Sequence, residues 1–152
     1  MYSINHKHSG FTLIELMAVV AILSIVTVIA LAAYGDYVVR SKVSEGMAFA
    51  AEAKTSVSAY YYDTNAMPTN NSQAGLPAAA DYAKHKYIHK LEITTLPEPG
   101  TITITFEIPG DKADNKLLQL VPETVNGVVY WNCIPPAVDG IDVNQVPPNC
   151  RG

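Results

Sequence analysis

The chain has 152 residues, of which 49% are hydrophobic and only 16% charged, with a formal net charge of −4 and an isoelectric point near 5.4. This length suggests a single domain. The negative charge gives no support for a nucleic-acid-binding surface, which requires an excess of basic residues, so we expect no specific nucleic-acid site.

A long apolar segment near the N-terminus predicts a membrane-spanning helix. From Leu16 to Ala33 there is no charged residue, and only Ser24 and Thr27 interrupt the apolar run. About 20 apolar residues, with a range of roughly 17–25, cross a bilayer core as a helix. The segment is long enough to do so.

The residues before this segment indicate how it is processed. Lys7, between two histidines, provides a short basic stretch, and Gly10 follows it directly before the apolar run. An ordinary secretory signal carries its small-residue cleavage site after the apolar core. Cleavage between Gly10 and Phe11 would instead leave the apolar segment on the mature protein, which would begin with Phe11.

The alternative is an ordinary signal peptide. Ala30-Leu31-Ala32 matches the A-x-A cleavage pattern, and cleavage there would release a soluble binding domain. However, the apolar run exceeds the usual signal core of about 7–15 residues. Glu15 also stands at its N-terminal edge, where such a core would exclude a carboxylate. Both features favour cleavage after Gly10.

Glu15 is the candidate assembly residue. A carboxylate at mid-bilayer costs on the order of 2.5–3.5 kcal/mol, and even near a helix end it calls for a partner. Cleavage exposes an α-amino group on Phe11, four residues earlier in the chain. Within one chain the helix macrodipole favours an acid in the first turns. Between chains, Glu15 would pair with the Phe11 amine of a neighbour, strongly in a low-dielectric bundle, and would fix the axial register.

These residues carry a family resemblance. The stretch from Gly10 to Met17, GFTLIELM, resembles the start of type IV prepilins, and the similarity continues more weakly through Tyr37 and the stretch Val43 to Glu45. Near the C-terminus, Trp131 to Cys133 and Pro147 to Cys150 resemble the edges of the disulfide-bonded loop of pilins. The specific similarity covers the first third of the chain and this last stretch.

The resemblance implies a processing and assembly route. It implies cleavage after Gly10 and N-methylation of Phe11 by a prepilin peptidase, with Glu15 as the assembly residue. It also implies an inner-membrane precursor and a homopolymeric surface pilus, assembled by cytoplasmic ATPases, an inner-membrane platform and an outer-membrane secretin. Adhesion, twitching motility and DNA uptake are the functions that such a pilus serves. The alternatives are a minor pilin or a pseudopilin of a type II secretion system, and the pair of cysteines favours a pilin over a pseudopilin.

Two residues depart from the family pattern. Ala32 stands where many pilins carry a proline, and Ser24 where many carry a glycine. Proline breaks a helix interior. A locally melted helix in the filament is therefore less assured here, although Gly35 is a second weak point.

The predicted fold class is α+β. We expect a leader at residues 1–10, a helix with a membrane and assembly half at 11–39 and an amphipathic half at 40–63, and a globular head at 64–152. At about 1.5 Å per residue this helix would be roughly 80 Å long, more than such a head can cover, so its first half must be buried in a bilayer or against other copies. A stripe at helical spacing marks the face that packs on the head: Val43, Met47, Ala50, Val57 and Tyr61.

The head is predicted to be a four-stranded antiparallel meander. Residues 64–86 have loop composition, and strand patterns follow at 87–96, 102–108, 117–121 and 128–133. Asn126-Gly127 is a strong hairpin-turn pair. We expect one sheet face to pack on the helix and the other to be partly exposed.

Cys133 and Cys150 form an even pair in a chain with an export segment, which favours a disulfide over a metal site. A free buried pair is the alternative. A bridge would close a loop of about 18 residues and stabilise the head by roughly 3 kcal/mol.

No metal, cofactor or enzymatic site is predicted. His85 and His89 have helical spacing but lie at the entry to a predicted strand. Asp111, Asp114 and Asn115 lack the later glutamate of an EF-hand calcium loop and fit a polar turn. The sequence contains no nucleophile–base arrangement and no phosphate-binding glycine loop.

Overall fold

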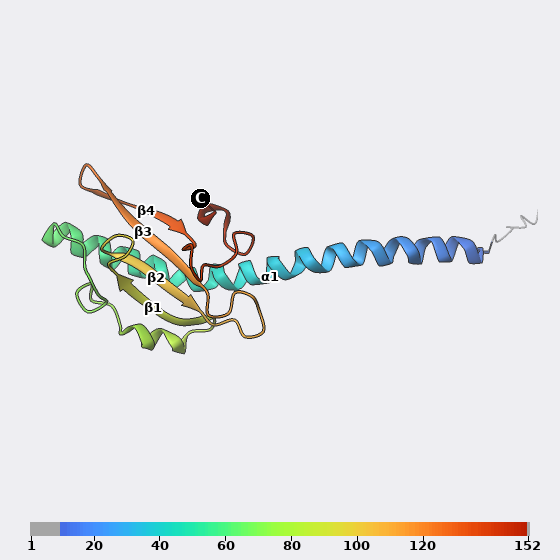
Figure 1. Ribbon diagram of the computed structural model, residues 1–152, viewed down its shortest axis with the longest axis horizontal. Coiled ribbons are helices and arrows are strands. Elements are labelled where there is room, and N and C mark those ends of the chain that lie inside the picture. The colour runs from blue at the N-terminus through green and yellow to red at the C-terminus, as the bar shows by residue number, and fades with distance from the viewer. Residues whose placement is uncertain (1–9, 152) are drawn as a thin grey trace, which may run out of the picture. The chain divides into compact units, whose positions relative to one another are not determined.

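A computed structural model describes residues 10–151 of the chain (Figure 1). The predicted leader, apart from Gly10, lies outside the described residues. The chain divides into two compact units, residues 1–35 and 36–152. Helix α1 (Leu13–Thr64, 52 residues) belongs to both units, and its bounds match the helix predicted from Phe11 to about Asp63.

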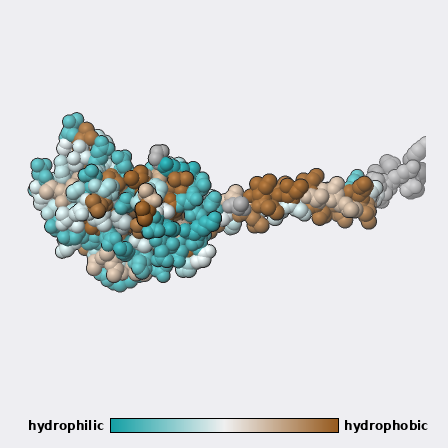
Figure 2. All heavy atoms as spheres, in the orientation of Figure 1, coloured by the Kyte–Doolittle hydropathy of each residue, from teal (hydrophilic) through white to brown (hydrophobic). Residues whose placement is uncertain are grey.

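The first unit is the apolar part of α1. The helix is long and apolar enough to cross a membrane. Its large side chains in this unit are exposed, as Figure 2 shows by the hydrophobic colour of its surface. The helix carries no proline, and Ser24 and Thr27 donate their hydroxyl hydrogen bonds to the carbonyls of Val20 and Leu23. The two polar side chains of the apolar run are therefore satisfied inside the helix, as a membrane segment requires.

The second unit packs the rest of α1 against a sheet, which confirms the predicted α+β fold. The sheet contains β1 (Ile88–Thr94), β2 (Thr101–Phe106), β3 (Leu117–Val125) and β4 (Val128–Ile134), in the order β1-β2-β3-β4, and every neighbouring pair is antiparallel. Two short 3₁₀ helices, η1 (Ala79–Lys84) and η2 (Pro148–Cys150), complete the elements.

The helix contacts the sheet through a seam of small and β-branched residues. Their spacing alternates between four and three residues, which keeps one face of a helix toward the sheet. They are Val39, Val43, Gly46, Ala50, Ala53 and Val57, all buried. Three members of the predicted stripe lie in this seam, whereas Met47 and Tyr61 flank it and are half-buried.

Gly46 is required for the close approach of helix and sheet. A Cβ atom built on Gly46 would lie 2.6 Å from Cε1 of Phe106, which is fully buried on β2. A rigid aromatic ring in a close-packed core cannot easily move away. The glycine therefore sets the distance between α1 and β2.

The inner strand β2 is buried on both faces, whereas the partly exposed sheet face that was predicted is found on its neighbours, where Glu92 and Gln119 are half-buried. Ile102, Ile104 and Phe106 point toward the helix, while Thr101, Thr103 and Thr105 occupy the opposite face and are also buried. Thr103 lies between two longer side chains, Glu92 on β1 and Gln119 on β3, and Thr105 likewise lies between Lys90 and Leu117. The flanking side chains shield them.

The β3–β4 hairpin confirms the predicted turn. Asn126 and Gly127 have φ values of 52° and 79°, as a type I′ turn requires, and Val125 pairs with Val128. Pairing extends β3 to Val125, beyond the predicted apolar run, because backbone ladder bonds continue where the apolar pattern ends. Residues 79–84, predicted as loop, form η1.

Asn71 connects the loop after α1 to the edge of the sheet. Its amide nitrogen donates to the carbonyls of Pro77 and Leu91, each at 2.9 Å, and its amide oxygen accepts from the Ile93 N–H at 2.7 Å. The side chain thus pairs with the free edge of β1 as a neighbouring strand would. It holds residues 71–77 against the sheet.

Candidate functional site

The first candidate site is the start of α1, where Glu15 and Thr12 form a capping box. Glu15 Oε2 accepts hydrogen bonds from the Thr12 N–H at 2.9 Å and the Thr12 hydroxyl at 2.8 Å. The Glu15 N–H in turn donates to Thr12 Oγ1 at 3.4 Å. This reciprocal pattern satisfies backbone donors that a helix start leaves unpaired. The T-x-x-E spacing was readable in the sequence, but the sequence prediction assigned Glu15 only to the macrodipole and to a neighbouring chain.

The capping box occupies one of the two carboxylate oxygens. Both Thr12 bonds go to Oε2, and Oε1 has no hydrogen-bond partner within residues 10–151. Gly10 and Phe11 precede the helix, and the Phe11 side chain is 84% exposed. Glu15 therefore keeps one acceptor available while it caps its own helix.

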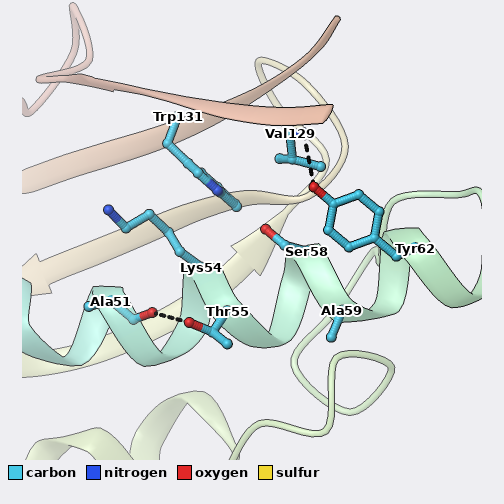
Figure 3. Close-up of a pocket in the computed structure, with 8 residues that line it drawn as sticks. All are labelled: Ala51, Lys54, Thr55, Ser58, Ala59, Tyr62, Val129 and Trp131. Atoms are coloured by element: carbon cyan, nitrogen blue, oxygen red, sulfur yellow. Dashed lines mark hydrogen bonds between the residues drawn. The ribbon is translucent and has the colours of Figure 1, made fainter. Parts of the chain in front are cut away.

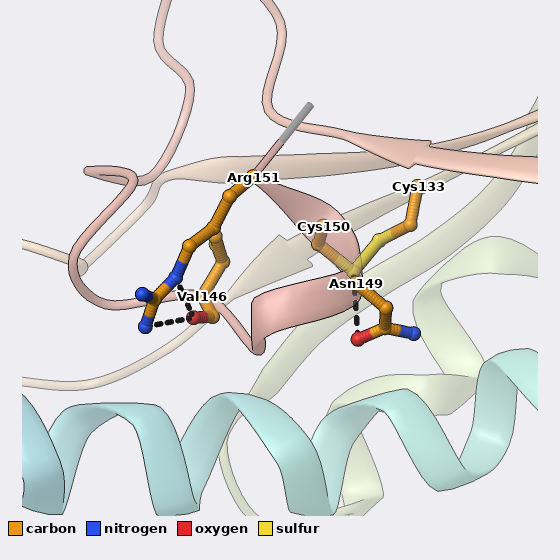
Figure 4. Close-up of a disulfide and its surroundings, with 5 residues drawn as sticks. All are labelled: Cys133, Val146, Asn149, Cys150 and Arg151. Atoms are coloured by element: carbon orange, nitrogen blue, oxygen red, sulfur yellow. Dashed lines mark hydrogen bonds between the residues drawn. A yellow bond between two sulfur atoms is a disulfide. The ribbon is translucent and has the colours of Figure 1, made fainter.

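The second candidate site is the loop closed by the Cys133–Cys150 disulfide (Figure 4). Cys133 lies on β4 and Cys150 on η2, so the bridge ties the loop to the sheet at both ends. Arg151 donates from Nε and Nη2 to the Val146 carbonyl, each at 3.4 Å. The Asn149 amide oxygen lies 3.9 Å from Cys150 Sγ. This is a van der Waals contact and not a hydrogen bond, because a disulfide sulfur has no hydrogen to donate.

Hydrogen bonds also attach this loop to α1 and β3. Arg40 Nη2 donates to the Asn144 carbonyl at 2.5 Å, and Gln145 Nε2 donates to Asp36 Oδ1 at 3.4 Å. The Leu117 N–H bonds to the Asp139 carbonyl at 2.8 Å. Ile141, Gln145 and Val146 are buried. The disulfide is thus one of several attachments, and the loop presents only part of its length to solvent.

The residues rejected as metal ligands have local roles in the structure. The His85 ring stacks on Phe49 with centroids 4.1 Å apart, whereas His89 lies on β1 with Nδ1 3.9 Å from Glu107 Oε2. Asp111 and Asp114 accept hydrogen bonds from the backbone N–H groups of Ala113 and Ile108. Within residues 10–151, no three His, Cys, Asp or Glu side chains gather in a way that could hold a metal ion.

Comparison with known proteins identifies the class to which this fold and these sites belong. A family model for pilin, described as a bacterial filament protein, matches residues 39–151, and a model for the prokaryotic N-terminal methylation motif matches residues 5–31.

Individual relatives are similar over nearly the whole chain. The type IV major pilin protein PilE1 of Neisseria gonorrhoeae is 36% identical, over 97% of this chain and 96% of the relative. The fimbrial protein EcpC of Eikenella corrodens is 38% identical over 97% and 94%. The type IV major alpha-pilin of Moraxella bovis is 32% identical over 84% and 86%. The chain belongs to the pilin family, which confirms the resemblance and extends it through the middle of the chain. Pilins are structural proteins and not enzymes.

Proposed function

We propose that this chain is the major subunit of a type IV pilus. In this proposal the precursor sits in the inner membrane and a prepilin peptidase cleaves it between Gly10 and Phe11. N-methylation of Phe11 follows, and the subunits polymerise into a surface filament. The observation that carries the proposal is the exposed apolar surface of α1, because such a continuous surface requires a bilayer or other subunits around it.

The free oxygen of Glu15 supports a role in setting the register. Oε2 is used within its own capping box, so the Phe11 amine of a neighbouring subunit can bind Oε1 without breaking the helix start. Inside a bundle of apolar helices this ion pair is only weakly screened by solvent. The ion pair would stabilise one axial offset between neighbouring subunits more than any other.

The assembly partners follow from the proposed route. They are the prepilin peptidase, cytoplasmic ATPases, an inner-membrane platform and an outer-membrane secretin. The filament would serve adhesion and twitching motility, with DNA uptake as a further role. The disulfide-closed loop and the similarity to major pilins favour this function over that of a pseudopilin or a minor pilin.

Three variants separate the charge of Glu15 from its capping role. Glu15→Gln keeps a side chain that can complete a capping box but removes the charge. Glu15→Ala removes both, and Thr12→Ala removes only the cap, at a cost of about 1 kcal/mol. The mature N-terminus is measured by mass spectrometry and filaments are counted by electron microscopy. We expect Glu15→Gln and Glu15→Ala to be processed at Phe11 but to yield few filaments, whereas Thr12→Ala assembles.

Two results would contradict the proposal. Normal filaments from Glu15→Gln would show that the charge does not set the register. A wild-type mature chain that begins near Ala33 would show an ordinary signal peptide, a soluble product and no pilus.

A further inference from the structure

An open groove of about 620 Å³ lies between α1 and β4 in the second unit (Figure 3). Lys54, Ser58 and Tyr62 rise from α1, and Trp131 points down from β4 toward them. Trp131 is half-buried, with part of its indole packed against the core. The groove thus has a flat aromatic wall opposite a row of polar side chains.

Most of the side-chain hydrogen-bond donors in this groove have no partner within the described residues, and the Tyr62 O–H is one of them, because this hydroxyl only accepts. Thr55 donates its hydroxyl to the Ala51 carbonyl at 3.0 Å, and the Tyr62 hydroxyl accepts from the Val129 N–H at 3.4 Å. In contrast, the Lys54 ammonium, the Ser58 hydroxyl and the Trp131 indole N–H take part in no hydrogen bond or ion pair within the described residues. The groove therefore combines unused donors with an aromatic surface.

The chemistry of these groups restricts the ligand. An apolar ligand would cover these donors without pairing them, which is costly. A nucleic acid would need several cations along its phosphates, and Lys54 is the only lysine or arginine that lines the groove. A neutral sugar would stack on the indole but leave the ammonium without a counter-charge.

We propose that this groove binds a sugar ring that carries a carboxylate. The apolar face of the ring stacks on Trp131, the carboxylate pairs with the Lys54 ammonium in a charge-assisted hydrogen bond, and ring hydroxyls accept from Ser58 and the indole N–H. The ligand class is that of uronic and sialic acids. This site adds a binding activity that depends on neither the cleavage at Gly10 nor the role of Glu15.

The test uses the intrinsic fluorescence of Trp131, which is the only tryptophan in the sequence. The detergent-solubilised full chain is titrated with methyl β-glucuronide and, separately, with methyl β-glucoside, which differs only at the carboxylate. We expect a saturable change with the glucuronide at millimolar concentration and binding of the glucoside about tenfold weaker, equivalent to about 1.4 kcal/mol.

Matched variants assign the effect to the groove. Lys54→Met keeps the apolar stem but removes the charge, and it should bring the glucuronide affinity down to that of the glucoside. Lys54→Arg should retain the preference. Lys112→Met removes an exposed lysine from the turn before β3 and should change nothing.

Several outcomes would overturn the proposal. These are no saturable response, equal affinity for the two glycosides, or an unchanged preference in Lys54→Met. A further one is strong protection of Trp131 from acrylamide quenching in filaments relative to the solubilised subunit, because a second copy of the chain would then occupy the groove. None of these results would contradict the proposal that the chain polymerises.

Discussion

Replacing Asn71 by aspartate tests how the loop after α1 is attached to the sheet. The change keeps the volume and the acceptor for the Ile93 N–H, but removes both bonds donated to the carbonyls of Pro77 and Leu91. Each buried partner left unpaired costs about 1–3 kcal/mol. A carboxylate facing two carbonyl oxygens adds a desolvation cost. We expect the free energy of unfolding to fall by about 2–5 kcal/mol at neutral pH.

The matched control is the neighbouring residue. Asn70 is exposed, and its side-chain oxygen accepts from the Gln73 N–H at 3.0 Å, a role that aspartate can keep. Asn70→Asp should change stability by no more than about 0.5 kcal/mol. Urea unfolding of the solubilised chain, followed by Trp131 fluorescence, measures both variants.

Acidification gives a second check on Asn71. Burial raises the pKa of the introduced carboxyl above its unfolded value, so the folded state holds the proton more tightly. The Asn71→Asp variant should therefore regain stability as the pH falls, when the protonated acid can donate one hydrogen bond again. Equal unfolding midpoints for Asn70→Asp and Asn71→Asp at neutral pH would refute the assigned role of Asn71.

Three further predictions concern the head. Gly46→Ala should destabilise it by roughly 0–2 kcal/mol, because overpacking against Phe106 outweighs the gain of about 1 kcal/mol in helix propensity; a raised urea midpoint would contradict this. Replacing Cys133 and Cys150 by serine should lower the free energy of unfolding by about 3 kcal/mol. An unchanged thermal unfolding midpoint would show that the hydrogen bonds from the loop to α1 and β3 hold it in place without the disulfide. Burial raises the pKa of the Tyr82 hydroxyl above its ordinary value near 10. The unfolded chain therefore loses the phenolic proton at a lower pH than the folded chain does. The free energy of unfolding consequently falls as the pH rises above about 10. Tyr82→Phe should remove that part of the alkaline loss, as measured by urea unfolding at increasing pH.

Strong local patterns explain why much of the fold was predictable. The α1 helix follows from a long run with helical apolar spacing, and the β3–β4 hairpin follows from Asn126-Gly127, a pair that tolerates two positive φ angles in succession. The Cys133–Cys150 pair required only an exported chain and an even cysteine count. Each of these signals is contained within a few residues or in a simple count.

The missed features depend on what lies opposite each residue. Gly46 and Ala53 belong to the seam because they are small, yet small residues add little to an apolar pattern. The threonines of β2 match the pattern of a solvent-facing strand face, and only the neighbouring strands bury them. Asn71 resembles a loop residue because its partners Leu91 and Ile93 lie 20 and 22 positions away. No local pattern reports such contacts.

The candidate sites were predictable to different degrees. The order of residues along the chain was enough to select the candidates at the N-terminus. A small residue (Gly10), the N-terminus that cleavage would create (Phe11) and an acid (Glu15) precede the apolar run. The groove beside Trp131 was not predicted, because its two sides come from α1 and β4, elements separated by most of the head. Tertiary folding alone brings Lys54 and Trp131 together.

The double burial of β2 has a consequence for isotope exchange. The strand is hydrogen-bonded to a neighbour on each side and shielded from water above and below. Its amides can exchange with heavy water only when the whole head opens, so their rate reports global unfolding and not local fraying. The deuterium uptake of a peptide that covers residues 101–106 thus measures the rate at which the whole head unfolds. Comparing its deuterium uptake in free subunits and in filaments measures how much polymerisation slows the unfolding of each head.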